Sequence, residues 1–143
     1  MADNTSADIT RYGPATHVFV VNVKRQIKDW SSDDEPWQME TLEDKRDIES
    51  HHGGGGILVE RTNEGALVTV SLKPGSKDSG YFSGLYQSGD IFDAEQTTIG
   101  TGEKILLSGG VVTKFGDVGR GFKPTNDNYQ MKFLKVVPVM GSK

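Results

Sequence analysis

The 143-residue sequence contains no cysteine, which excludes disulfide bonds and metal sites built on thiolates. It also lacks any apolar run close to the ~20 residues that a membrane-spanning helix needs. The first residues, MADNTSADITRYG, are polar and contain no apolar segment of the kind found in secretory signals. We therefore expect no membrane insertion by this chain, and we expect it to fold in the cytoplasm of the cell that makes it.

Motifs for catalysis and metal binding are scarce. The three histidines are His17, His51 and His52, and the adjacent pair would point to opposite sides of an extended chain. No zinc-binding spacing such as HExxH follows them. The glycines after His52 lack the Lys-Ser/Thr of a P-loop and precede a strand pattern, so they supply no helix N-terminus for a phosphate. We expect no enzyme activity, no catalytic residue, no metal and no cofactor.

The sequence is poor in hydrophobic residues, at 34%, and rich in glycine, with 18. This composition is typical of a protein with many strands and turns. The net charge of −4 is unevenly spread. Residues 28–50 carry nine acidic and three basic side chains, a balance of −6, which leaves +2 for the rest. Such an acidic segment repels nucleic-acid phosphates, and it is either a solvated loop or a loop that contacts a partner.

Apolar periodicity predicts strands and one helix. Residues 57–61 and 66–72 alternate around the turn TNEG, so we expect a hairpin over 57–72. The helix is expected over 76–88, with Ser76 as its cap, Asp78 in its first turn and Gly89 after its end. HHGGGG is interpreted as a flexible hinge between the acidic loop and this hairpin. Further strands are expected at 16–24, 90–100, 103–115 and 128–139. The strand over 103–115 is expected to have a bulge or bend at Gly109-Gly110. The strand over 128–139 ends apolar on both faces, which predicts that part of it is covered on both sides.

Both tryptophans, Trp30 and Trp37, lie in the polar segment 28–53, which we expect to be irregular. They anchor this segment either on its own domain or on a neighbouring subunit, because tryptophan is enriched at interface hot spots.

The stretch GGILVERTNEGALVTVSLKPGSKDSGYFSGLYQSG, residues 55–89, resembles the core of tail tube proteins from contractile-tailed, Mu-like bacteriophages. METLEDKRDIES before it, KILLSGGVVTKFGDVGRG after it and the closing LKVVPVMG are also similar to that family. The resemblance covers roughly residues 16–140.

The resemblance implies a mainly β fold, a sandwich or barrel of two packed antiparallel sheets with one short helix. Each subunit would give strands to a ring-shaped β-barrel. Homohexameric rings would stack into a hollow tail tube in the virion, alongside the tail sheath, baseplate and tail terminator proteins. Double-stranded DNA would pass through without specific binding. An arm over residues 1–15 would precede a single domain over 16–143, and residues 28–53 would form an inter-subunit loop.

On this interpretation Trp30, Trp37, Met39 and Leu42 are the expected inter-subunit anchors. Glu60, Thr69 and Ser71, the polar face of the expected hairpin, are candidates for the lumen. Three other functions remain open: a type VI secretion-like tube, a virion accessory such as a tail-completion or decoration protein, and a monomeric β-sandwich that binds a small ligand.

Overall fold

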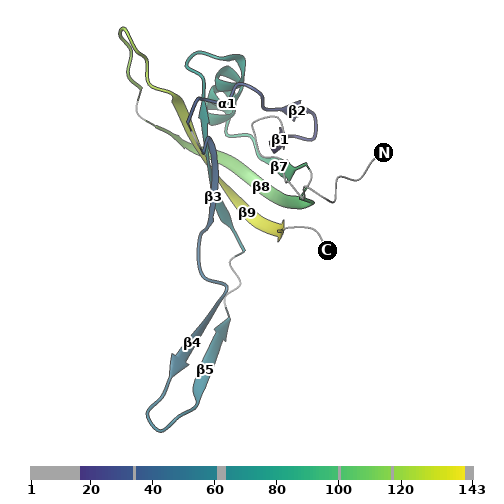
Figure 1. Cartoon of the computed structure of the whole chain (residues 1–143), viewed down its shortest axis with the longest axis vertical. Coiled ribbons are helices and arrows are strands. Elements are labelled where there is room, and N and C mark those ends of the chain that lie inside the picture. Colours follow the sequence, from purple (N-terminus) through teal and green to yellow (C-terminus); the bar gives the residue numbers. More distant parts are fainter. Residues whose placement is uncertain (1–16, 34, 61–63, 100, 117, 141–143) are drawn as a thin grey trace, which may run out of the picture.

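A computed structural model describes residues 17–140 except 34, 61–63, 100 and 117, so the expected arm over 1–15 lies outside the described residues. The chain forms strands and one helix (Figure 1). In chain order these are β1 (His17–Val21), β2 (Arg25–Gln26), β3 (Trp37–Thr41), β4 (Arg46–Ser50), β5 (Gly56–Glu60), β6 (Ala66–Leu72), α1 (Lys77–Ser88), β7 (Phe92–Thr98), β8 (Glu103–Phe115) and β9 (Asp127–Val139).

The main sheet has seven antiparallel strands in the order β2-β1-β7-β8-β9-β6-β3. It curves strongly, because Phe19 on β1 and Trp37 on β3 lie near opposite ends of the strand order, yet their ring centroids are 5.8 Å apart. The sheet is not closed into a barrel. The second sheet, β4–β5, projects away from the first (Figure 1), so the mainly β class is confirmed but the expected packing of two sheets is not.

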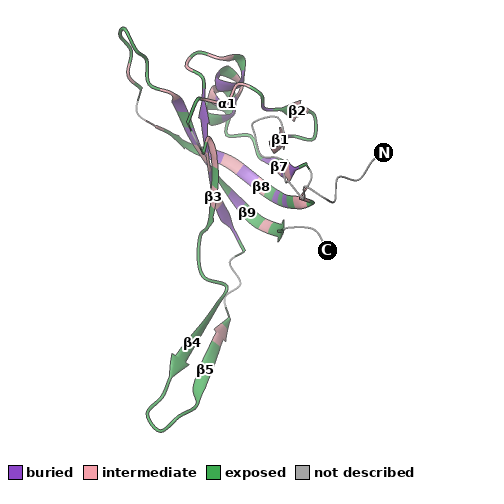
Figure 2. Cartoon of the chain, in the orientation of Figure 1, coloured by how far each residue is buried: buried purple, intermediate pink, exposed green. Residues whose placement is uncertain are grey.

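The core lies on the concave side of the main sheet, where α1 contributes Phe82 and Leu85. Figure 2 shows burial concentrated in this sheet and helix, whereas β4–β5 is almost entirely exposed. The largest fully buried side chains are Phe19, Phe82, Phe133, Ile27, Leu72, Leu107, Met131, Val21, Val68 and Val70, together with Thr98. The strands therefore place one apolar face inward, as period-two alternation requires.

Helix α1 has the ends that its sequence predicts. The Ser76 side chain accepts a hydrogen bond from the Ser79 backbone N–H, and Gly89 adopts a left-handed conformation with φ of 71°. The Gly89 N–H donates to Leu85 O at 2.9 Å, which satisfies a carbonyl of the last turn.

The expected hairpin over 57–72 does not form. β5 pairs with β4, whereas β6 pairs with β3 and β9. The acidic segment 28–53, expected to be irregular, supplies β3 and β4. The strand signal in this segment is the alternation in WQMET, where Trp37 and Met39 pack on the core and Gln38 and Glu40 stay exposed.

The bulge expected in β8 is confirmed, because the register with β7 shifts between Phe92 and Ala94, and Gly109 has φ of 65°. In β9 every second residue up to Phe133 points into the core, but the alternation then shifts by one residue. Val136 therefore packs on the core, while Val137 is exposed. The end of β9 is not covered on both faces. Leu134 is 77% exposed, and a Cβ added at Gly109 would lie 3.2 Å from the Leu134 Cβ.

Candidate assembly surfaces

From here on, the arm means the β4–β5 hairpin, residues 46–60, and not the N-terminal residues 1–15. It carries apolar side chains that its own chain leaves uncovered. Ile48 is 71% exposed, Leu58 54% and Ile57 51%. An isolated two-stranded hairpin is only marginally stable in water. A second surface packed on these side chains would therefore stabilise the arm.

The two faces of the arm differ in chemistry. Ile48 and Leu58 are register partners, and this face also carries the ion pair between Arg46 Nε and Glu60 Oε1 at 3.9 Å. We call the opposite face the acidic arm face. By strand alternation it consists of two register pairs, Asp47 with Val59 and Glu49 with Ile57.

HHGGGG forms the tip of the arm, so its interpretation as a hinge between two other elements is wrong. The His51 N–H donates to Gly55 O at 3.2 Å, and the Gly54 N–H donates to His51 O at 3.3 Å. Gly53, Gly54 and Gly55 have φ of 85°, 90° and 79°. Glycine adopts these positive angles without steric cost, which explains the run of glycines at a reversal of the chain.

Three of the four expected inter-subunit anchors pack on their own core. Trp30, Trp37 and Met39 are partly buried against it, and the Phe19 ring lies 6.2 Å from Trp30. The tryptophans thus fasten their segment to its own domain. Leu42, just beyond β3, is 39% exposed and is the one of the four that the core does not hold.

The three lumen candidates do not share one face. Glu60 lies at the end of β5 in the arm, whereas Thr69 and Ser71 lie on β6 of the main sheet. Ser71 is buried and its hydroxyl donates to Asp33 Oδ2 at 3.0 Å. Thr69 is half-buried on the convex face, in register with Gln38 on β3 and Gln130 on β9. The expected 57–72 hairpin would have placed these residues on one face, but β5 and β6 do not pair with each other.

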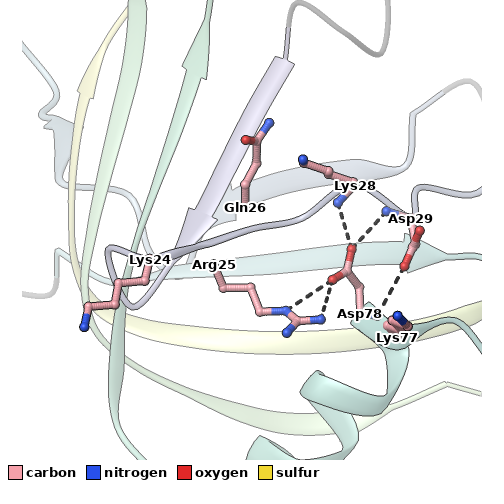
Figure 3. Close-up of a pocket in the computed structure, with 7 residues that line it drawn as sticks. All are labelled: Lys24, Arg25, Gln26, Lys28, Asp29, Lys77 and Asp78. Carbon is pink, nitrogen blue, oxygen red and sulfur yellow. Dashed lines mark hydrogen bonds and ion pairs between the residues drawn. The ribbon is translucent and has the colours of Figure 1, made fainter.

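An open hollow of about 670 Å³ lies beside the start of α1 (Figure 3). At its base the Asp78 carboxylate accepts hydrogen bonds from the backbone N–H groups of Lys28 and Asp29, at 2.7 and 2.9 Å. Arg25 Nη2 lies 2.9 Å from the same carboxylate. Burial raises the pKa of Asp78, but these donors outweigh it and hold the pKa below its usual value. The carboxylate is therefore occupied in joining α1 to the segment after β2.

Among the described residues, no three His, Cys, Asp or Glu side chains gather closely enough to hold a metal ion. Within the same residues, no helix has the length and apolar character needed to cross a bilayer.

Two apolar residues of the arm, Ile48 and Leu58, were not among the predicted site residues. A signal for them exists: RDIES and GILVE both alternate, and a short glycine-rich run separates them, as in a hairpin.

The fold is similar to that of the anti-feeding prophage cap, a tube-terminating cap solved by cryo-electron microscopy. The two structures have a TM-score of 0.59 and 12% sequence identity. The match covers 98% of this chain and 100% of the cap chain, so the likeness extends over the whole fold. No family model and no curated protein matches the sequence.

Proposed function

We propose that this chain is a ring-forming structural subunit of a phage-like contractile tail, located in or on the tail tube. The observation that carries the proposal is the arm, a hairpin that projects from its own sheet with apolar side chains exposed on both faces. The fold similarity to a tube-terminating cap supports the same class of protein.

The arm has the energetics of an assembly element. Burying a Leu or Ile side chain completely contributes about 1.5–3 kcal/mol, so covering the exposed halves of Ile48, Ile57 and Leu58 contributes roughly 3 kcal/mol. The net charge of −4 keeps single subunits apart until such contacts form.

Within this class we propose a tail tube subunit that forms six-membered rings and works with sheath, baseplate and terminator proteins. The resemblance to tail tube proteins supports this finer assignment. The row Gln38, Thr69 and Gln130 spans three neighbouring strands of the convex face with uncharged polar side chains. On β8 the row continues with the exposed Lys114, in register with Gln130, so if this face lines the bore it offers DNA one cation per copy along that row and holds a duplex only weakly.

The second candidate is a terminating ring that ends a tube. The match over the full length of a tube-terminating cap favours it. The two candidates differ in how assembly stops. A tube subunit adds ring upon ring, whereas a terminating protein closes one ring and presents no second stacking surface.

Sedimentation velocity over a concentration series, with negative-stain microscopy of each species, tests the proposal. A ring-forming subunit gives a closed oligomer well above the 15.6 kDa chain, with a central hole in top views. Stacks of rings identify the tube subunit, and single rings identify the terminating protein. A monomer at every concentration contradicts both candidates and favours the ligand-binding sandwich.

A further inference from the structure

The described part of the loop between β8 and β9, residues 118–126, projects from the end of the molecule opposite the arm (Figure 1). At its tip Phe122 is exposed at 110% of its reference area, the highest value of any large hydrophobic residue in the described chain. Val118 in the same loop is 58% exposed. An aromatic side chain in this setting is a strong candidate for a binding anchor, since aromatic residues are enriched at interface hot spots.

The neck of this loop is held by hydrogen bonds. The Gly119 N–H donates to Thr125 Oγ1 at 2.8 Å, and the Thr125 N–H donates to Gly119 O at 3.0 Å. Arg120 Nη2 forms an ion pair with Asp127 at 2.8 Å, and Nη1 donates to Gly119 O at 2.9 Å. These contacts hold the two sides of the loop together at its neck, so less ordering entropy is lost when a partner covers Phe122 than in a loop without them.

The tip and the arm are chemically complementary. Lys123 follows Phe122, is exposed and makes no ion pair with the described residues. The acidic arm face offers an apolar pair, Ile57 and Val59, beside the carboxylates Asp47 and Glu49. One end of the molecule therefore presents an aromatic residue next to a cation, and the other end presents an apolar patch next to anions.

We propose that the loop tip of one copy docks on the acidic arm face of the next copy, with Phe122 against Ile57 and Val59, and Lys123 beside Asp47 and Glu49. The inference rests on the proposed ring-forming function and extends it from single rings to stacks. Because the two surfaces are different and lie at opposite ends of the long axis, the contact is head-to-tail. Contacts of this kind propagate into an open stack along that axis when the rotation between successive copies does not close a ring.

Charge exchange between the two surfaces tests the proposal. The variants are Phe122→Ala, Lys123→Glu, Glu49→Lys and the double variant Lys123→Glu with Glu49→Lys. Lys24→Glu, an exposed lysine in the turn between β1 and β2, is the matched control. The readouts are the protein concentration at which stacks appear by light scattering, ring counts in negative-stain images, and thermal unfolding to verify the fold.

We expect Phe122→Ala to raise the stacking concentration roughly tenfold or more, and each charge reversal to raise it severalfold. The double variant should return to within about twofold of the parent, and Lys24→Glu should match the parent. Unchanged stacking in Phe122→Ala, or a double variant no better than its single variants, overturns the inference. Parent protein that stops at single rings also overturns it while leaving the ring-forming function intact. Parent protein that forms no ring overturns the proposed function itself.

Discussion

Asp78 is the residue whose replacement should most clearly weaken the fold. Its side chain, in the first turn of α1, is almost completely buried and accepts from two backbone N–H groups and from Arg25. Asp78→Asn keeps the shape but replaces one carboxylate oxygen by an NH2 group. That group then faces donors, either the N–H groups of Lys28 and Asp29 or the guanidinium of Arg25.

The magnitude follows from the donors left without an acceptor. Each buried donor that loses its partner costs about 1–3 kcal/mol. The Arg25 side chain is 36% exposed, so solvent screens its share, which is about 1 kcal/mol at most. We therefore expect Asp78→Asn to lower the free energy of unfolding by roughly 2–4 kcal/mol, and Arg25→Gln to lower it less.

Urea unfolding monitored by tryptophan fluorescence measures this change, because Trp30 and Trp37 both lie against the core. Asp90→Asn is the matched control, since residue 90 is exposed and its replacement should change stability by under about 0.5 kcal/mol. An Asp78→Asn variant as stable as this control would refute the view that the carboxylate joins α1 to the segment after β2.

Three further predictions concern pH, packing and capping. The pKa values of Asp78 and Asp127 are both lowered in the fold. Their contribution to the free energy of unfolding is therefore complete above the unfolded pKa of 3.8, and it is lost as the pH falls through the folded pKa values. The urea midpoint should thus be flat from about pH 5 to 7 and fall below about pH 4, less steeply in Asp78→Asn. Gly110→Ala should cost about 1–3 kcal/mol in urea unfolding, because the added Cβ collides with the Phe133 ring; an unchanged midpoint would contradict that packing. Ser76→Ala should cost about 1 kcal/mol, measured by thermal unfolding, through loss of the cap on the Ser79 N–H; Ser76→Thr, which keeps a hydroxyl, should lose less.

Local signals in the sequence were sufficient for the helix and for the main-sheet strands β1, β6, β7, β8 and β9, but not for β2 and β3. The α1 cap, its C-terminal glycine and the bulge in β8 each depend on a few neighbouring residues. The chain therefore carries these features in short motifs that can be interpreted without knowledge of the fold.

Strand pairing was not predictable in the same way. β5 and β6 both alternate and lie close in sequence, and this pattern predicts a hairpin between them. Gly53–Gly55 instead reverse the chain one strand earlier, and β6 takes β3 and β9 as partners. The expected hairpin also placed Glu60 on one face with Thr69 and Ser71, whereas the observed pairing puts Glu60 in the arm and the other two in the main sheet. Pairing depends on long-range packing, which alternation does not encode.

The assembly surfaces depend on exposure, which the sequence alone does not report. The sequence suits Trp30 and Trp37 equally to a neighbouring subunit or to their own core, and in the single chain both rings lie against Phe19 of the core. The exposed residues Ile48 and Phe122 lie in polar segments, where a single apolar residue gives no periodic pattern that marks it as part of a binding surface.

Cryo-electron microscopy of the purified protein, at the highest concentration that stays in solution, tests the central claim most directly. The account predicts closed rings with a central hole, in which the β4–β5 arm of each copy is ordered against another copy. A single population of 15.6 kDa monomers with an uncovered arm would contradict it.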